Sequence, residues 1–381
     1  MIKRWVKVLV SVIVGLAAGS AAFVGWVASI FMGRAGFYSV AIAAAYAALL
    51  TALVAWTGSR RKIMVAGLCA LLVAGLAMGI RIGYDGYIAS IPVVEESRIR
   101  LNEYRPFAEG SKVARLDGQA SLHLSEGLPR IDGATALYPL YASFVAATYP
   151  EGDYDPESGS VLCTTTGNAY KNLINGDVDV IFCAEPSAEQ IRAVAEKGAA
   201  FDMTPIGKEA FVFFVNDKNP ITGLSSEQVR GIYSGCITDW SDLGGKPGAI
   251  KVFQRPKNSG SQTILEKIMS GYELMEPLRE EVIDGMGGII EQTADYKNYK
   301  NAIGYSFLYY STRMAGNGLI RLLAIDGAYP SGESIRDGSY PFTSSFYAIT
   351  LGSSTQETKK LITWILSAEG RTLVERTGYQ P

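Results

Sequence analysis

Three segments of this chain place small hydroxyl residues and glycine where a strand is expected to end and a helix to begin. They are 132–137 (DGATAL), 163–168 (CTTTGN) and 255–263 (RPKNSGSQT). The first turn of a helix has backbone N–H groups without partners in the helix, and the helix dipole makes that end positive. Glycine lets a ligand approach the backbone, and Ser and Thr hydroxyls add donors without bulk. Each segment is therefore a candidate anion-binding turn.

The third segment begins with Arg255, whose planar guanidinium group suits a tetrahedral oxyanion. Ser and Thr are also preferred helix N-caps, and a single such turn is more simply explained as a cap. Three of them in one α/β region favour a binding site, because ligands of open α/β sheets bind where strands end. The alternative of three independent caps stays open at this point.

The composition argues against an enzyme. The whole chain has one histidine, His123, and it lies outside the three turns. The sequence has no GxSxG elbow, no GxxxxGK[ST] phosphate loop and no cluster of residues with metal-ligand spacing. The formal net charge of −2 gives no general attraction to nucleic acid. We therefore predict a binding protein that uses no metal and no cofactor.

Short apolar runs alternate with helical patterns from Leu128 to the C-terminus. Strands are expected at 128–133, 161–168 and 178–186, each followed by a helix, and a pair of strands is expected within 201–217. Such alternation predicts an α/β fold with a mainly parallel sheet. A stretch of this length is large for one sheet, and two lobes with a cleft between them are the natural division.

The N-terminal part predicts a membrane domain over residues 1–85. A bilayer core needs about 20 apolar helical residues, and three stretches satisfy this at about 8–32, 37–57 and 63–80. A signal peptide is the alternative for the first stretch, but that stretch is long for a signal peptide and two more follow it. We expect three retained transmembrane helices.

Basic residues predict the orientation of these spans. Three lie before the first span, and a cluster at 60–62 lies between the second and third, whereas the loop between the first two spans holds only Arg34. Lys and Arg are enriched on the cytoplasmic side. The prediction is a multi-pass protein of the cell membrane with a cytoplasmic N-terminus and an extracytoplasmic region after Arg81.

Four cysteines are scattered along the chain. Cys69 falls in the third predicted span, which leaves Cys163, Cys183 and Cys236 outside. An odd number of widely spaced cysteines is no disulfide framework. A bond between Cys163 and Cys183 stays open, since both fall near expected strand ends.

The three turns stand in a longer pattern of motifs. The segments are DGATALYPLY, TTTGNAYKNL followed by DVDVIFCAEPS, LSSEQVRGIYSGCITDWSDLGG, RPKNSGSQT and NAIGYSFL. In this combination the chain resembles the periplasmic phosphate-binding proteins of ABC transporters, from about Pro129 to the end. The resemblance covers about two-thirds of the chain, and the combination of motifs is more specific than any one of them.

The resemblance implies which residues contact the ligand. The first turn matches the family's G-A-T-x-x-x-P, the second its S-x-G run, and the third its R-x-D-G-S-G-T loop. The implied ligand-binding residues are Thr135, Ala136, Thr165, Thr166, Glu185, Arg255, Ser259, Gly260 and Ser261.

Two departures from the family pattern matter. The family has an aspartate that accepts the proton of hydrogen phosphate and repels sulfate, and here Glu185 is the candidate for that role, with Pro186 at or beside the matching position. A solvated surface carboxylate is the alternative for Glu185. The second turn is one residue longer than usual, so Thr165 and Thr166 are both candidates, and we favour Thr166.

The resemblance also implies a type II periplasmic-binding-protein fold, two α/β lobes joined by two crossovers and closed like a hinge on the ligand. We expect a linker at 86–126 and the binding domain at 127–381. The first lobe would hold 127–212 and 343–381, and the second 213–342. The crossovers are expected near 211–215 and 340–345.

The implied function is capture of inorganic phosphate outside the cell for ABC-type uptake. The expected partners are phosphate, the lipid bilayer, and either ABC permease subunits or a membrane signalling partner. A membrane-fixed phosphate or oxyanion sensor, or an accessory subunit, is one alternative. A structural surface protein that has lost its ligand is another.

Overall fold

A computed structural model describes residues 101–276, 299–315, 318–352 and 354–381. All of them belong to one compact unit, Val93–Pro381. No helix within these ranges is long and apolar enough to cross a membrane. The three predicted spans, at about 8–32, 37–57 and 63–80, lie outside the described residues.

The strands form a mixed sheet. Its order is β1-β2-β9-β3-β6-β5, with β7 also paired to β3, and a separate small sheet pairs β4 with β8. The pairs β1–β2 and β5–β6 are parallel, whereas β2–β9, β9–β3, β3–β6 and β3–β7 are antiparallel. The strands are β1 Ile131–Gly133, β2 Val180–Cys183, β3 Phe201–Asn216, β4 Gly223–Leu224, β5 Lys251–Val252, β6 Ala302–Phe307, β7 Ile320–Leu322, β8 Ala324–Ile325 and β9 Thr343–Leu351.

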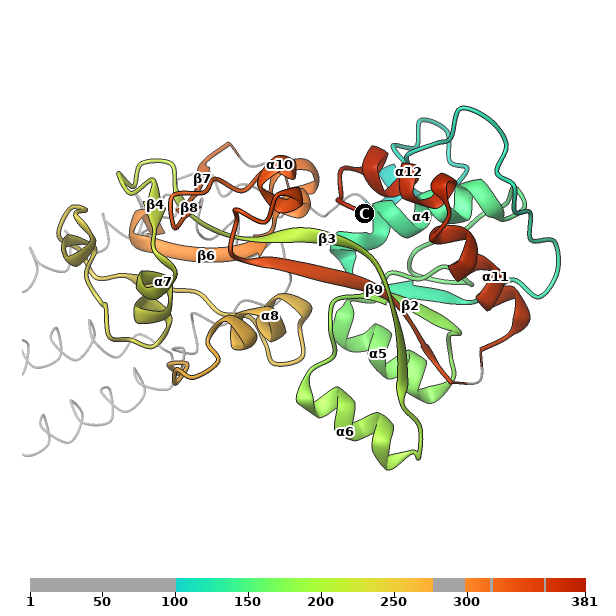
Figure 1. Cartoon of the computed structure of the whole chain (residues 1–381), viewed down its shortest axis with the longest axis horizontal. Coiled ribbons are helices and arrows are strands. Elements are labelled where there is room, and N and C mark those ends of the chain that lie inside the picture. Colours follow the sequence, from blue (N-terminus) through green and yellow to red (C-terminus); the bar gives the residue numbers. More distant parts are fainter. Residues whose placement is uncertain (1–100, 277–298, 316–317, 353) are drawn as a thin grey trace, which may run out of the picture. The chain divides into compact units, whose positions relative to one another are not determined.

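Helices flank both ends of this sheet (Figure 1). The α-helices are α4 Tyr138–Thr148, α5 Thr166–Asn175, α6 Ala188–Glu196, α7 Ser226–Tyr233, α8 Gly260–Ile268, α10 Gly332–Arg336, α11 Gln356–Ile365 and α12 Ala368–Thr377. The short 3-10 and π turns are η1 Leu101–Tyr104, η2 Thr135–Leu137, η3 Trp240–Leu243, η5 Tyr299–Asn301 and η6 Tyr310–Met314.

Two hydrophobic cores divide the described chain into lobes. One core joins α4, α5, α11 and α12 to β1 and β2, and the other joins α7, α8 and β6 to the second half of β3. Tyr104, Val113 and Leu124 are buried in the first core. The segment expected as a linker at 86–126 therefore contributes packed side chains in its second half.

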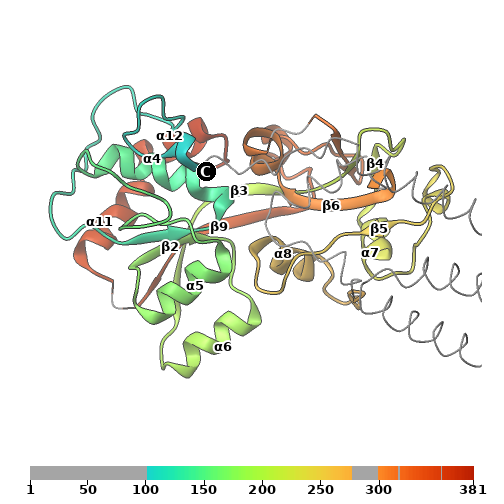
Figure 2. The ribbon, with the colours of Figure 1, turned by 180° about the vertical axis from the view of Figure 1, so that it is seen from behind.

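Two strands run from one lobe into the other, as Figures 1 and 2 show for β3 and β9. The segment 201–217 is a single strand with a register shift between Pro205 and Gly207, so the expected pair of strands is wrong. Its first part pairs with β9 and its second part with β6. Because β3 crosses outward and β9 returns, they run antiparallel, which is why the expectation of a mainly parallel sheet is also wrong.

The crossing point is narrow and demands a glycine. A Cβ on Gly207 would lie 2.5 Å from Phe346 Cζ and 2.8 Å from the Gln380 carbonyl oxygen. Ile206 and Phe346 belong to the first core, whereas Ala210 and Phe342 belong to the second. The passage between the lobes thus falls at 207–209 in β3 and 343–345 in β9.

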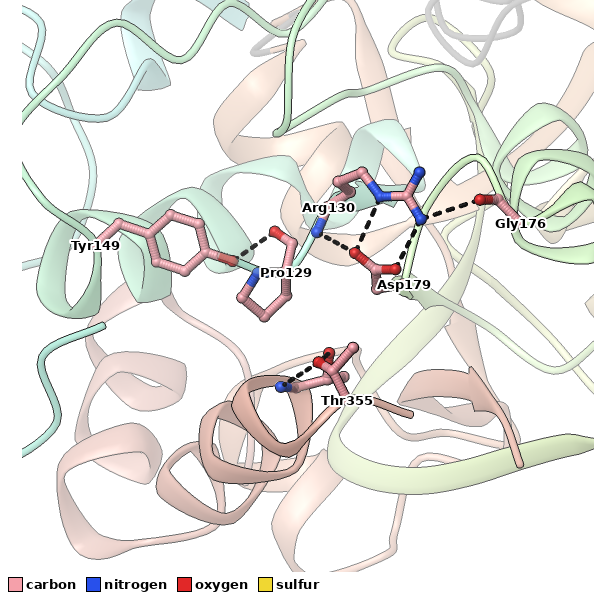
Figure 3. Close-up of polar contacts among 7 residues, drawn as sticks. Pro129, Arg130, Tyr149, Gly176, Asp179 and Thr355 are labelled. Atoms are coloured by element: carbon pink, nitrogen blue, oxygen red, sulfur yellow. Dashed lines mark hydrogen bonds and ion pairs between the residues drawn. The ribbon is translucent and has the colours of Figure 1, made fainter. Parts of the chain in front are cut away.

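An ion pair fixes the start of β1 against the start of β2 (Figure 3). The Arg130 backbone N–H donates to Asp179 Oδ2 at 2.7 Å, and its guanidinium donates to both Asp179 oxygens and to the Gly176 carbonyl. The Tyr149 hydroxyl donates to the Pro129 carbonyl at 2.7 Å. These bonds hold the end of the parallel strands that lies opposite the turns discussed below.

We expect Asp179→Asn to lower the free energy of unfolding by about 0.5–1 kcal/mol at neutral pH. Burial raises the pKa of Asp179, but the Arg130 hydrogen bonds outweigh this and leave that pKa below its usual range. A depressed pKa stabilises the fold above about pH 4, and the contribution is lost as pH falls through the folded value. Urea denaturation at several pH values measures this difference.

The neighbouring Asp177→Asn is the matched control, because the Asp177 side chain is exposed and lies in the same loop. We expect it to leave stability nearly unchanged. An Asp179→Asn deficit that did not shrink at all as the pH was lowered from 7 through the acid range would contradict the assignment to the ion pair.

Candidate functional site

A buried carboxylate ties the first two predicted turns together. Asp132 is fully buried in the middle of the short strand β1. It accepts hydrogen bonds from the backbone N–H groups of Gly133 at 2.7 Å and Thr164 at 2.9 Å. The Thr164 hydroxyl donates to it at 2.5 Å and Asn172 Nδ2 at 2.8 Å. Both carboxylate oxygens of Asp132 therefore have hydrogen-bond donors from within the protein. Asp132 thus positions the turns and does not contact a ligand.

The third turn is held by a network around Gln262. Its side-chain Oε1 accepts from the Arg255 backbone N–H at 3.0 Å and from the Tyr305 hydroxyl. The same Arg255 N–H lies 2.8 Å from the Tyr305 oxygen. Ser259 is the N-cap of α8, and its hydroxyl accepts from the Gln262 N–H at 3.3 Å. This network fixes the course of the chain from β5 into α8.

The three turns meet at one small cavity between the lobes. Its volume is about 20 Å³, room for about one water molecule. The lining comes from the three turns, the residue after β2, the end of β6 and the crossing strands: Ala134, Ala136, Leu137, Thr166, Ala184, Glu209, Gly260, Phe307, Ser344, Ser345 and Phe346. The structure thus shows that the three turns converge, which their spacing in the sequence left open.

Glycine is required where the second and third turns touch. A Cβ on Gly260 would lie 2.9 Å from the Thr166 hydroxyl oxygen. Such a contact is closer than side-chain carbons normally come, so any other residue at 260 displaces the Thr166 side chain at the start of α5. The close approach makes Gly260 a specific feature of the site.

Polar contacts hold the cleft in a closed arrangement. The Ser187 hydroxyl donates to Asn258 Oδ1 at 2.7 Å, and Asn258 Nδ2 donates to Glu189 Oε2 at 2.9 Å. Lys267 of α8 forms an ion pair with Glu185 at 2.8 Å. Each contact joins the loop before α8, or α8 itself, to the segment that follows β2. The small cavity is the result of this closure.

The predicted site residues divide into three groups. Ala136, Thr166 and Gly260 line the cavity. Arg255 and Ser261 are buried in the third turn, and Ser259 caps α8 beside them. The remaining three are Thr135, Thr165 and Glu185. Neither this group nor the second group is part of the cavity lining.

The two threonine candidates of the second turn are placed differently. Thr166 is buried and is the first residue of α5. Thr165 is exposed, with a φ of 79° and no capping hydrogen bond from its side chain. Thr135 is half-buried, and its side chain contacts the Cys163 thiol. Of the two candidates, the structure thus brings Thr166 to the cavity.

Glu185 joins the two lobes. It pairs with Lys267, and it accepts a hydrogen bond from the Tyr347 hydroxyl at 3.1 Å. The hydrogen bond from Lys267 lowers the Glu185 pKa, against a smaller opposing effect of burial. The residue of this segment that lines the cavity is the preceding one, Ala184.

The carboxyl group that does line the cavity belongs to Glu209, which the sequence analysis did not single out. It lies on β3 at the crossing and is only 4% exposed. Burial raises the pKa of Glu209 to about 8, although the Tyr309 backbone N–H donates to its Oε1 at 2.5 Å. A lone glutamate directly before the apolar run AFVFFV was the available signal.

The cysteines carry no chemistry at this site. Cys163, Cys183 and Cys236 are all free thiols. Burial raises the pKa of Cys163 to about 12, so it stays protonated and unreactive. Within the ranges that the structure describes, no group of three or more His, Cys, Asp or Glu side chains is placed to hold a metal ion.

Comparisons with known proteins identify the family of most of this chain. The model of the PBP superfamily domain matches residues 123–369. The phosphate-binding protein PstS of Bacillus subtilis is 25% identical over 280 residues, which cover 71% of this chain and 86% of that protein. PstS of Borreliella burgdorferi is 24% identical over 264 residues, covering 67% of this chain and 90% of that protein.

A solved structure shares the fold. It is a protein of Clostridium perfringens that is assigned as a phosphate ABC transporter substrate-binding protein and was crystallised with bound phosphate. The alignment has a TM-score of 0.53 and 22% identity, and it covers 68% of this chain and 98% of that one. With the family model matching well over half of its length, the chain belongs to the PBP superfamily.

Proposed function

We propose that this protein is a membrane-anchored, extracytoplasmic solute-binding protein that captures inorganic phosphate for ABC-type uptake. The observation that carries the proposal is the meeting of three helix-starting turns at one inter-lobe cavity, through Ala136, Thr166 and Gly260. The relatives named above are phosphate-binding proteins, and this supports phosphate as the ligand.

The chemistry of the turns suits a tetrahedral oxyanion. The helices α5 and α8 begin at Thr166 and Gly260 and direct backbone N–H groups and positive dipole ends to the place where the turns meet. Thr166 adds a hydroxyl, and the buried Arg255 adds a positive charge to the third turn. Several donors from both lobes would share one ligand, so binding favours the closed arrangement.

Anchoring and delivery extend this proposal. The predicted spans at about 8–32, 37–57 and 63–80 would hold the binding domain at the outer face of the membrane, where ABC permease subunits are the expected partners. Two crossings, β3 and β9, support the type II form of the fold, in which hinge closure reports the bound ligand.

We expect Gly260→Val to weaken phosphate binding at least tenfold, about 1.4 kcal/mol or more. The added side chain would meet the Thr166 hydroxyl and keep the two lobes from closing. Isothermal titration calorimetry with phosphate measures the effect. Gly118→Val is the control, because nothing lies within 4 Å of a Cβ at that position. Equal affinities of the two variants would count against the site, and a wild-type protein that bound no phosphate would refute the function.

The second turn gives an independent test. We expect Thr166→Val to weaken phosphate binding by about 1 kcal/mol, roughly fivefold, because it removes a donor while keeping the shape of a buried side chain. Thr165→Val is the matched control, since that side chain is exposed. Calorimetry at one pH compares both with the wild type. The reverse order of effects would reassign the contact to Thr165.

Membrane anchoring is tested on the full chain. We expect it to remain in the membrane pellet after alkaline carbonate extraction, because three apolar helices in a bilayer are not released by disrupting electrostatic contacts. A variant that begins after residue 85 should appear in the supernatant. Release of the full chain by carbonate would argue against integral spans.

A further inference from the structure

We propose that Tyr379 is a positioning residue of the phosphate site and that it couples this site to the segment 101–127, which is called the strap below. This inference rests on the proposed function and deepens it. The strap follows the predicted spans in the sequence and leads into β1. Its residues 101–122 and Tyr379 lie outside the range 123–369 that the family model matches. Both are therefore features of this chain beyond the matched domain.

The Tyr379 hydroxyl fixes the first of the three turns. It donates a hydrogen bond to the Ala136 carbonyl oxygen, from a position 243 residues later in the chain. Ala136 is only 1% exposed and lines the cavity. Burial raises the pKa of Tyr379 well above its usual range, so the hydroxyl keeps its proton and stays a donor. The bond sets the plane of the peptide group that follows Ala136, and with it the direction of the turn.

The Tyr379 ring is held beside the strands that join the lobes. Its centroid lies 4.8 Å from that of Tyr309 and 5.1 Å from that of Phe346 in β9. The neighbouring Gln380 pairs with Lys208 of β3 through two backbone hydrogen bonds, at 2.6 and 3.1 Å. The C-terminal end of the chain accordingly lies next to β3 in Figures 1 and 2. Aromatic packing of this kind fixes the position of the ring.

Tyr309 brings the second lobe into contact with this ring. It lies two residues after β6, a strand of the second lobe, yet its side chain packs against the first core. The Tyr309 backbone N–H donates to Glu209 Oε1 at 2.5 Å, beside the crossing. Hinge motion of the second lobe moves Tyr309 relative to Tyr379. The stacking of the two rings therefore depends on closure of the lobes.

The strap reaches the same cluster through Tyr104. This side chain is 8% exposed, belongs to the first core and makes a polar contact with the Tyr309 hydroxyl. Further along, the strap is fastened to the first lobe, where the Leu124 N–H donates to the Thr148 carbonyl at 2.8 Å. A segment that is fixed to one lobe and touches a residue of the other responds to movement between the two.

Phosphate and the strap should therefore affect each other. The contacts run without a gap from Tyr104 through Tyr309 and Tyr379 to Ala136. Phosphate that draws the lobes together tightens the strap, and by linkage a loosened strap weakens phosphate binding by the same factor. Because the strap follows the predicted spans, occupancy of the site would reach the N-terminal part of the chain through it.

Calorimetry of the full chain with inorganic phosphate tests the positioning role. We expect Tyr379→Phe to bind phosphate roughly fivefold more weakly, because the ring stays but the Ala136 carbonyl loses its donor. Tyr149→Phe is the matched control, since it removes another buried hydroxyl that donates to a carbonyl of the same lobe, that of Pro129. Both variants should lose similar thermal stability, but only Tyr379→Phe should lose affinity. A merely structural role would change neither affinity.

Hydrogen–deuterium exchange of the full chain tests the coupling. The Lys112 N–H, which donates to the Glu103 carbonyl at 2.7 Å, is the reporter in the strap. Saturating phosphate should slow its exchange at least twofold in the wild type and less in Tyr104→Phe, while α11 of the same lobe serves as the internal reference. Tyr104→Phe should also bind phosphate about twofold more weakly. The wild-type measurement decides on the coupling even if Tyr379→Phe fails to fold.

The possible failures are distinct. Equal phosphate affinities of Tyr379→Phe and Tyr149→Phe would remove the positioning role. Strap exchange that phosphate leaves unchanged in the wild type, or slows no more than that of α11, would overturn the coupling. In either case phosphate binding by the wild type leaves the proposed function intact. A wild type that binds no phosphate refutes the proposed function as well.

Discussion

The pairing of β3 with β9 is the constraint on which the rest of this domain depends. Both strands leave one hydrophobic core and enter the other, and they are the only described segments of the sheet that do so as continuous strands. Every inter-lobe contact is therefore made at the geometry that this pair allows. Gly207 lets the chain cross where Phe346 and the backbone of Gln380 leave no space for a side chain. Glu209, Ser344 and Ser345 belong both to these crossing strands and to the lining of the cavity.

Within the first lobe, a network of satisfied polar groups makes the turns rigid before any ligand arrives. The Asp132 carboxylate accepts from two backbone N–H groups and two side chains, so its burial is compensated. Gln262 has a similar role in the second lobe, where its side-chain oxygen accepts hydrogen bonds from the Arg255 backbone N–H and the Tyr305 hydroxyl. Donors that are fixed in advance lose little freedom when they bind an anion. Each lobe thus presents a preformed part of the proposed site.

Local features of the site were predictable from the sequence because they depend on a few adjacent residues. Small residues and glycine at strand-to-helix junctions indicated the turns that contain Thr166 and Gly260, and both line the cavity. The mixed sheet was not predictable in this way, because β3 pairs with a strand about 130–150 residues later in the chain. Glu209 was missed for the same reason. Its place in the cavity follows from that distant pairing and not from its neighbours in sequence.

The two lobes are joined across the cleft by polar contacts that are easily broken. Asn258 with Ser187 and Glu189, and Lys267 with Glu185, are partly exposed polar pairs, and such pairs contribute about 0–1 kcal/mol each. The cores on either side are apolar and much more costly to disrupt. The lobes therefore separate more easily than either unfolds, with bending concentrated at the crossing strands.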